Sequence, residues 1–100
     1  MPRYILLSNV TCEGLETISK NPQRILEVNR EVEAMGVKII DQYALLGPYD
    51  FVTVVEAPDE VTVAKLSVML GSRGTVKITS LPAIPTGTFV EKLSGKKTEG

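Results

Sequence analysis

Two β-branched runs separated by only four residues constrain the fold of this 100-residue chain more than any other feature. The first run covers residues 37–46 and the second covers residues 51–57, and the Gly-Pro-Tyr-Asp segment at 47–50 has the composition of a turn. Two strands joined by so short a connection form an antiparallel hairpin. The other segments of the chain must therefore be arranged around this hairpin.

The segment before the hairpin is predicted to hold one strand and one helix. Residues 3–10 place large apolar side chains on both faces of a strand, as is typical of a central position in a sheet. Residues 11–21 are expected to form a short helical turn at most. A helix then begins at Asn21-Pro22, with Asn as the N-cap and Pro in the first helical position, and it closes at Gly36.

The segment after the hairpin is predicted to hold a second helix, a fourth strand and a terminal segment. Residues 58–60 open the helix with two carboxylates in its first turn, where the helix dipole favours them, and a glycine at 71 or 74 ends it. Residues 75–81 form a strand that the prolines at 82 and 85 stop. The apolar residues within 89–93 are expected to dock as a terminal segment.

The resulting β-α-β-β-α-β order is the split arrangement of ferredoxin-like α+β domains. The right-handed crossover rule leaves essentially one topology, a four-stranded antiparallel sheet with both helices on one face. We expect a single domain over residues 1–93 and a flexible polar tail over residues 94–100.

The second face of this sheet needs a partner. Side chains alternate across a strand, so the helices can bury only one of the two apolar sets that the strands carry. A contiguous exposed set marks an interface or a ligand groove. We predict a homodimer or higher homo-oligomer with sheets packed face to face, and the alternative is a lone sheet covered by the C-terminal tail. The aromatic residues are all expected outside the helices: Tyr4, Tyr43, Tyr49, Phe51 and Phe89.

Composition excludes several classes of site. The chain has no histidine, which rules out His-based catalytic triads and His-ligated metals. The 11 Lys and Arg against 12 Asp and Glu give a net charge of −1, which argues against nucleic-acid binding. The carboxylates lack metal-ligand spacing, so we expect no metal and no cofactor.

The sequence also favours a cytoplasmic location. It shows no signal peptide and no apolar run long enough for a membrane helix, so no membrane partner is expected. Its single cysteine, Cys12, cannot form an intramolecular disulfide, whereas small secreted domains are usually stapled by several. We expect Cys12 to be a buried or idle thiol.

The hairpin turn carries a motif as well. Gly47, Tyr49 and Asp50 resemble the G-x-Y-D signature of GYD-domain proteins. Four further features agree in chain order: T-x-x-G at Thr11 and Gly14, P-x-R at Pro22 and Arg24, E-A-P-D at 56–59, and G-x-x-G at Gly71 and Gly74 with Val76 and Thr79 behind it. The match runs from about residue 3 to residue 93. It departs from the family pattern at Val10, where tryptophan is common, and at Cys12, where aspartate is commoner.

This resemblance implies a ferredoxin-like domain of the dimeric α/β-barrel type. It implies little about chemistry, because relatives in that wider superfamily include monooxygenases, isomerases and ligand-sensing domains.

The candidate ligand-binding residues are Tyr4, Arg24, Tyr43, Tyr49, Asp50 and Phe51. Tyr49 and Asp50 are also the candidate catalytic acid–base pair. The alternative is structural: Asp50 caps backbone N–H groups of the turn, and Tyr49 gives its ring to the core. Arg24 either clamps an anion near a helix N-terminus or pairs with a carboxylate, for instance Glu27 or Asp50.

Two functions follow from these observations. The first is a homo-oligomeric module that binds a small ligand or a partner. The alternative is a cofactor-independent enzyme of the dimeric α/β-barrel type, monooxygenase- or isomerase-like, that uses Tyr49 and Asp50 as acid and base.

Overall fold

The computed structural model describes residues 1–95 and contains a four-stranded antiparallel sheet. Its strands are β1 (Arg3–Val10), β2 (Lys38–Ala44), β3 (Phe51–Glu56) and β4 (Val76–Ala83), in the spatial order β2-β3-β1-β4. β1 is therefore a central strand, paired with β3 on one side and β4 on the other. This position explains why both of its faces are apolar.

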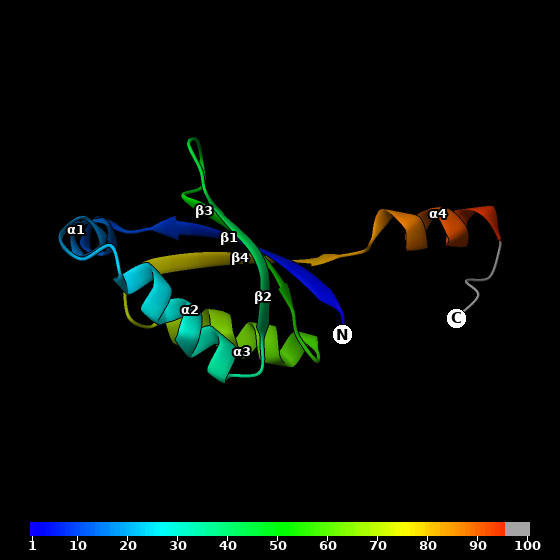
Figure 1. The fold of residues 1–100 in the computed structure, drawn as a ribbon, viewed down its shortest axis with the longest axis horizontal. Helices are drawn as coiled ribbons and strands as arrows, with labels where there is room; N and C mark the ends of the chain where they lie inside the picture. The colour runs from blue at the N-terminus through cyan, green and yellow to red at the C-terminus, as the bar shows by residue number, and fades with distance from the viewer. Residues whose placement is uncertain (96–100) are drawn as a thin grey trace.

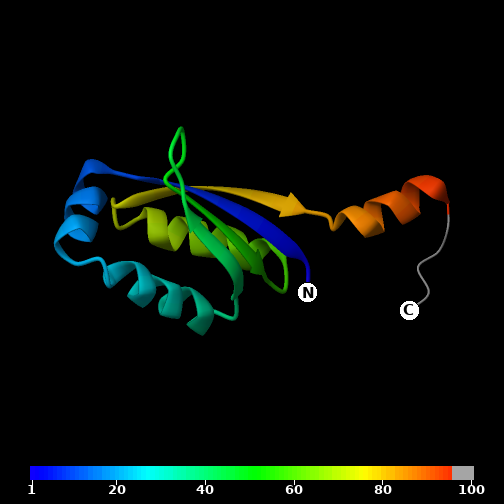
Figure 2. The ribbon, with the colours of Figure 1, turned by 45° about the horizontal axis from the view of Figure 1, so that its top comes forward.

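Helices α2 (Arg24–Ala34) and α3 (Glu60–Gly71) lie on the same side of the sheet (Figure 1). Figure 2 shows both helices beneath the strands, with the other face of the sheet bare. The core between the two layers is apolar: Tyr4, Leu6, Val32, Val37, Val55, Ala57, Val63, Leu66 and Leu70 are all buried. The ferredoxin-like α+β fold is thus confirmed.

Helix α3 begins as its sequence predicts. The Asp59 carboxylate accepts hydrogen bonds from the Thr62 backbone N–H at 2.8 Å and from the Thr62 hydroxyl at 2.7 Å. These bonds satisfy donors that the first turn leaves unpaired, and they lower the pKa of the Asp59 carboxyl group.

The segment that follows β1 departs from the prediction, because it forms a full helix, α1 (Cys12–Lys20), instead of a short turn. Thr11 caps this helix, and an ion pair at 2.9 Å joins Lys20 to Glu16 one turn earlier. The predicted start of the next helix at Asn21-Pro22 is also wrong. Asn21 closes α1, and a short turn separates it from α2.

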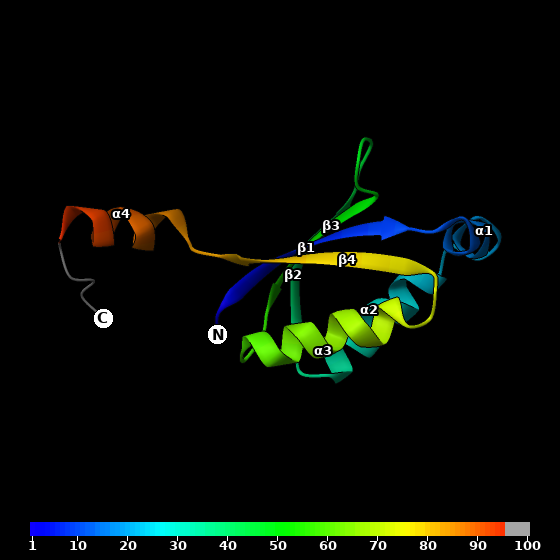
Figure 3. The same ribbon diagram turned by 180° about the vertical axis from the view of Figure 1, so that it is seen from behind.

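The C-terminal part differs from the prediction in two ways. β4 continues through Pro82, which an edge strand tolerates because one side of it has no partner strand. Beyond it, α4 (Thr86–Ser94) extends away from the sheet and does not dock on it (Figure 3). Phe89 consequently lies in a helix, against expectation. Ser94 and Gly95 end α4, and the rest of the predicted tail lies outside the described residues.

The projecting helix makes the molecule elongated. The Cα radius of gyration is 15.5 Å, against the roughly 13 Å expected for a compact domain of this length. α1 and α4 lie at opposite ends of the long axis in Figure 1.

A β-bulge in β2 sets which of its side chains face the helices. Ile39 pairs with Val55 and Asp41 pairs with Val54, so Ile40 is left between them. The extra residue turns both Ile39 and Gln42 toward the helix side. Asp41 and Tyr43 therefore point to the bare face of the sheet.

Candidate functional site

Asp50, the last residue of the G-x-Y-D motif, joins the hairpin to the end of β1. The Val10 backbone N–H donates to its carboxylate at 2.8 Å, and the Asp50 N–H donates to the Ser8 carbonyl, also at 2.8 Å. The Asp50 carbonyl accepts from the Leu45 N–H across the loop. The first two bonds hold the hairpin against the end of β1 and the third closes the loop, so the Asp50 carboxylate caps a backbone N–H of the central strand and none of the turn.

The T-x-x-G and G-x-x-G motifs form a second set of hydrogen bonds at the end of β1, beside those of Asp50. The Thr11 hydroxyl accepts from the Gly14 N–H at 3.2 Å and donates to the Gly74 carbonyl at 2.8 Å. The Thr11 N–H donates to the Thr75 carbonyl at 2.9 Å. A Cβ atom on Gly14 would lie only 2.3 Å from that same carbonyl oxygen, so α1 can approach β4 this closely only with glycine there.

Cys12 is the first residue of α1 and directly follows Thr11, which makes these hydrogen bonds. The sequence predicts a buried or idle thiol here: burial is wrong, because the side chain is exposed, and the idle thiol stays a prediction.

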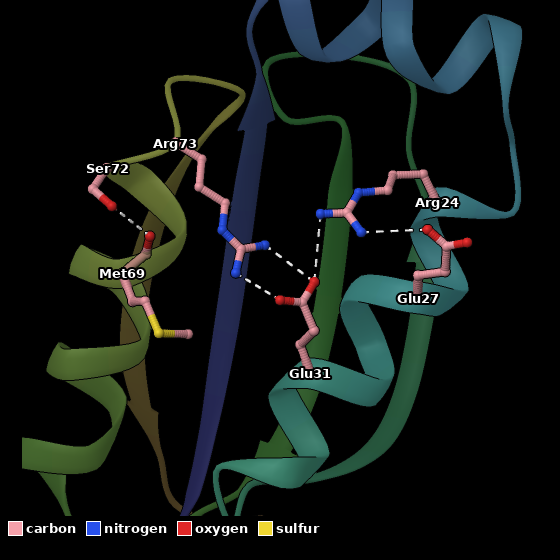
Figure 4. Close-up of polar contacts among 6 residues, drawn as sticks. All are labelled: Arg24, Glu27, Glu31, Met69, Ser72 and Arg73. Atoms are coloured by element: carbon pink, nitrogen blue, oxygen red, sulfur yellow. Dashed lines mark hydrogen bonds and ion pairs between the residues drawn. The ribbon is translucent and has the colours of Figure 1, made fainter.

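Arg24, the arginine of the P-x-R motif, belongs to a chain of ion pairs between α2 and the turn that follows α3 (Figure 4). Arg73 donates to both carboxylate oxygens of Glu31, at 2.6 and 3.1 Å. Arg24 lies 3.5 Å from Glu31 on the other side and 3.3 Å from Glu27. The expected pairing of Arg24 with Glu27 is therefore confirmed.

These contacts shift the proton affinities of the residues that they join. The hydrogen bond from Arg73, with the positive charges of Arg73 and Arg24, lowers the pKa of the Glu31 carboxyl group despite its partial burial. The same hydrogen bond raises the pKa of Arg73. Glu31 is thus held as a carboxylate between two guanidinium groups.

A cavity of about 290 Å³ lies between the sheet and the helices, beneath this ion-pair chain. Its walls come from the helix-facing side of the sheet, from α1 and α2, and from the turn after α3. Most of the lining side chains are aliphatic or aromatic, among them Leu6, Val10, Ile25, Val28, Phe51 and Ile78. The charged residues in its lining are Arg24 and Arg73.

A small polar network lies in the wall of this cavity. The side-chain amides of Asn29 and Gln42 bond to each other twice, at 2.7 and 3.1 Å. Gln42 also donates to the hydroxyl of buried Thr53 at 3.0 Å. These groups tie α2 to two strands of the sheet.

The structure places the six candidate ligand-binding residues in four separate locations. Arg24 and Phe51 line the cavity. Tyr49 and Asp50 lie half-buried in the hairpin loop. Tyr43 is on the bare face of the sheet and is 60% exposed, whereas Tyr4 is only 5% exposed in the core.

The Tyr4 phenol lies near the start of α3. Its burial, followed by the negative charges of Glu60 and Asp59, raises its pKa. Tyr4 therefore stays protonated and neutral at physiological pH.

The domain model for the GYD domain matches residues 4–93. The chain belongs to the GYD domain family. The match includes all four strands and α4 as far as Leu93, so the projecting helix is part of the GYD domain. The motifs on which the resemblance rests form, in the structure, the hydrogen bonds at the end of β1, the ion pairs of Arg24 and, through Asp59, the cap of α3.

A relative of this GYD chain is a protein from Thermus thermophilus named glutamine synthetase and cystathionine beta-lyase binding protein. The two are 53% identical over 94 residues, which cover 93% of this chain and 99% of the relative. No solved structure matches the chain significantly.

Sequence reasoning missed the polar residues at the wall and the mouth of the cavity. Asn29 and Gln42 bond to each other across two elements, and the closest partner of Glu31, Arg73, lies in the turn after α3, so the spacing of these pairs along the chain carries no signal. Gln42 and Thr53 interrupt otherwise apolar inward positions of β2 and β3, and this interruption was the one available signal. Within residues 1–95, no helix is long and apolar enough to cross a membrane.

Proposed function

We propose that this GYD-domain protein is a binding module for protein partners, and that its partners are glutamine synthetase and cystathionine β-lyase. The observation that carries this proposal is the 53% identity to the Thermus thermophilus protein that bears those names, over nearly the full length of both chains. At such a level of identity the two chains share a fold.

The first contact surface in this proposal is the apolar stripe of α4. Phe89, Val90 and Leu93 lie on one side of this helix at one-turn spacing, and Phe89 and Leu93 are 52% and 72% exposed. A nine-residue helix is marginally stable in water on its own, and α4 makes no extensive contact with the other elements of residues 1–95. Docking in a groove of a larger enzyme would both bury the stripe and stabilise the helix.

The bare face of the sheet supports self-association as a second part of the proposal. Ile5 and Leu7 of β1 lie beside Val54 and Val52 of β3, and all four side chains are half-buried without a covering layer. Within residues 1–95, α4 extends away from this face and leaves it uncovered (Figure 3). Face-to-face pairing of two copies would cover both sheets with one symmetric contact.

A binding titration tests the partner assignment. Glutamine synthetase and cystathionine β-lyase from the organism that makes this chain are each titrated with the full-length protein, by interferometry or calorimetry. The double variant Phe89→Asp/Leu93→Asp should weaken binding by about tenfold or more, because charges replace the apolar stripe.

Thr88→Asp is the control, since it adds one negative charge on the opposite side of α4. It should bind as the wild type does. Failure of the wild type to bind either enzyme would contradict the partner assignment. Equal binding by the double variant and the wild type would contradict only the role of α4.

A further inference from the structure

The cavity between the sheet and the helices is large for a domain of this size. Protein interiors are close-packed, and voids larger than a water molecule are few. An engineered apolar cavity of about 150 Å³ binds benzene. The cavity here has about 290 Å³, roughly the room that a two-ring aromatic molecule needs.

Its walls favour an uncharged occupant. Val28 of α2 and Ile78 of β4 belong to a lining that is aliphatic or aromatic over most of its extent. The charged lining residues, Arg24 and Arg73, are already neutralised by Glu27 and Glu31. A charged ligand would leave water without gaining an unpaired counter-ion, at high free-energy cost.

The polar network supplies one hydrogen bond for such an occupant. Both N–H groups of the Gln42 amide are used, one by Asn29 and one by Thr53. The Asn29 amide gives one N–H to Gln42 and has a second N–H to donate. Since Asn29 lines the cavity, that donor matches a hydroxyl or carbonyl oxygen on the ligand.

The ion-pair chain marks the mouth of the cavity. The side chains of Arg24 and Arg73 are 38% and 34% exposed, so the cavity reaches the surface where they lie. Through Glu31 they bridge α2 and the turn after α3 (Figure 4). A ligand that enters here passes beside this chain of ion pairs.

We propose that this cavity binds a neutral, mainly apolar molecule of two-ring aromatic size that carries one hydroxyl or carbonyl oxygen. The apolar walls hold its rings, and Asn29 donates to its oxygen. This site lies on the opposite side of the sheet from the bare face and away from α4, so its occupation does not depend on the binding of a protein partner.

The test uses 2-naphthol as the probe and the full-length protein without any partner. Because the chain has no tryptophan, the fluorescence of 2-naphthol is read without an indole background. Saturable binding at a stoichiometry of about one is expected. Naphthalene-2-carboxylate, which is charged at neutral pH, should bind about tenfold or more weakly.

Val28→Phe fills the cavity from α2 and should weaken 2-naphthol binding by about tenfold or more. Val61→Phe makes the same substitution at an exposed position of α3 outside the cavity and should leave binding unchanged. Ile78→Phe fills the cavity from the sheet if Val28→Phe does not fold. In the wild type, NMR shift changes on titration should centre on Val28, Asn29 and Ile78.

Absence of saturable 2-naphthol binding would overturn the proposal, as would shift changes centred elsewhere. Unchanged affinity in a folded cavity-filling variant would overturn the location of the site. Tighter binding of naphthalene-2-carboxylate than of 2-naphthol would overturn the neutral ligand class.

Discussion

The carboxylate of Asp50 accepts a hydrogen bond from the backbone N–H of Val10 across 40 positions of sequence, at 2.8 Å. This bond fixes the tip of the β2–β3 hairpin to the end of the central strand. Asp50→Ala should therefore lower the free energy of unfolding by about 1.5–3 kcal/mol, the range for hydrogen bonds to charged groups. Asp50→Asn keeps an acceptor oxygen and should cost less. Urea denaturation measures both, with Asp41→Ala on the exposed face as the control. Wild-type stability in Asp50→Ala would show that the bond contributes nothing to the fold.

Gly14 is the residue through which α1 touches the end of β4. Gly14→Ala should destabilise the protein by about 1–3 kcal/mol, because its Cβ would meet the Thr75 carbonyl oxygen and the Val10 side chain. Gly87→Ala is the matched control: this glycine is also helical, but it has open space around it. Thermal unfolding should give a lower Tm for Gly14→Ala alone. Equal Tm values in both variants would mean that α1 tolerates displacement from the sheet.

Glu31 makes the stability of the domain depend on pH. The pKa of Glu31 in the folded state lies below the ordinary value of 4.5. The stability that its ion pairs contribute is therefore fully present at pH values above 4.5, and it is lost as the pH falls through the lowered pKa of the folded state. Wild type should exceed Glu31→Gln in Tm at neutral pH, and the difference should vanish in strong acid. Parallel melts across pH 2–7 at low salt measure it, with Glu33→Gln on the same helix as the control. A constant difference across this range would exclude titration of Glu31 as its cause.

The bare sheet face predicts the oligomeric state. Val54→Lys places a charge among the half-buried apolar side chains of β1 and β3 and should convert an assembled protein into monomers. Light scattering after gel filtration measures the mass directly, against 10.9 kDa for one chain. Val61→Lys makes the same substitution at an exposed position of α3, on the helix side of the sheet, and is the control. A wild-type protein that is already monomeric at micromolar concentration would rule out the symmetric pairing.

The strands and their hairpin were predictable because β-branched runs and a Gly-Pro turn are local signals. α1 was missed because its residues offer only Leu15 and Ile18 as an apolar pair, while its cap, Thr11, depends on Gly74 far along the chain. The position of α4 was equally out of reach, since an apolar stripe shows that a helix needs a partner but not where that partner lies.

The candidate site was predictable only in part for the same reason. Arg24 and its pairing with Glu27 follow from helical spacing, whereas the contact between Arg73 and Glu31 spans 42 positions. The cavity is a volume left between two layers, and no residue in the sequence encodes it alone. The motif residues Thr11, Gly14 and Asp50 were visible as a set, but their meeting at the end of β1 appears only in three dimensions.

Pro82 limits how copies of this protein can join. β4 forms an open edge of the sheet, and an unpaired edge can recruit further strands into an unlimited ribbon. Proline has no N–H group to donate, so a strand added along β4 would lose a rung of its ladder at this residue. Strand addition along this edge is therefore disfavoured, whereas symmetric pairing through the sheet face is not affected by Pro82.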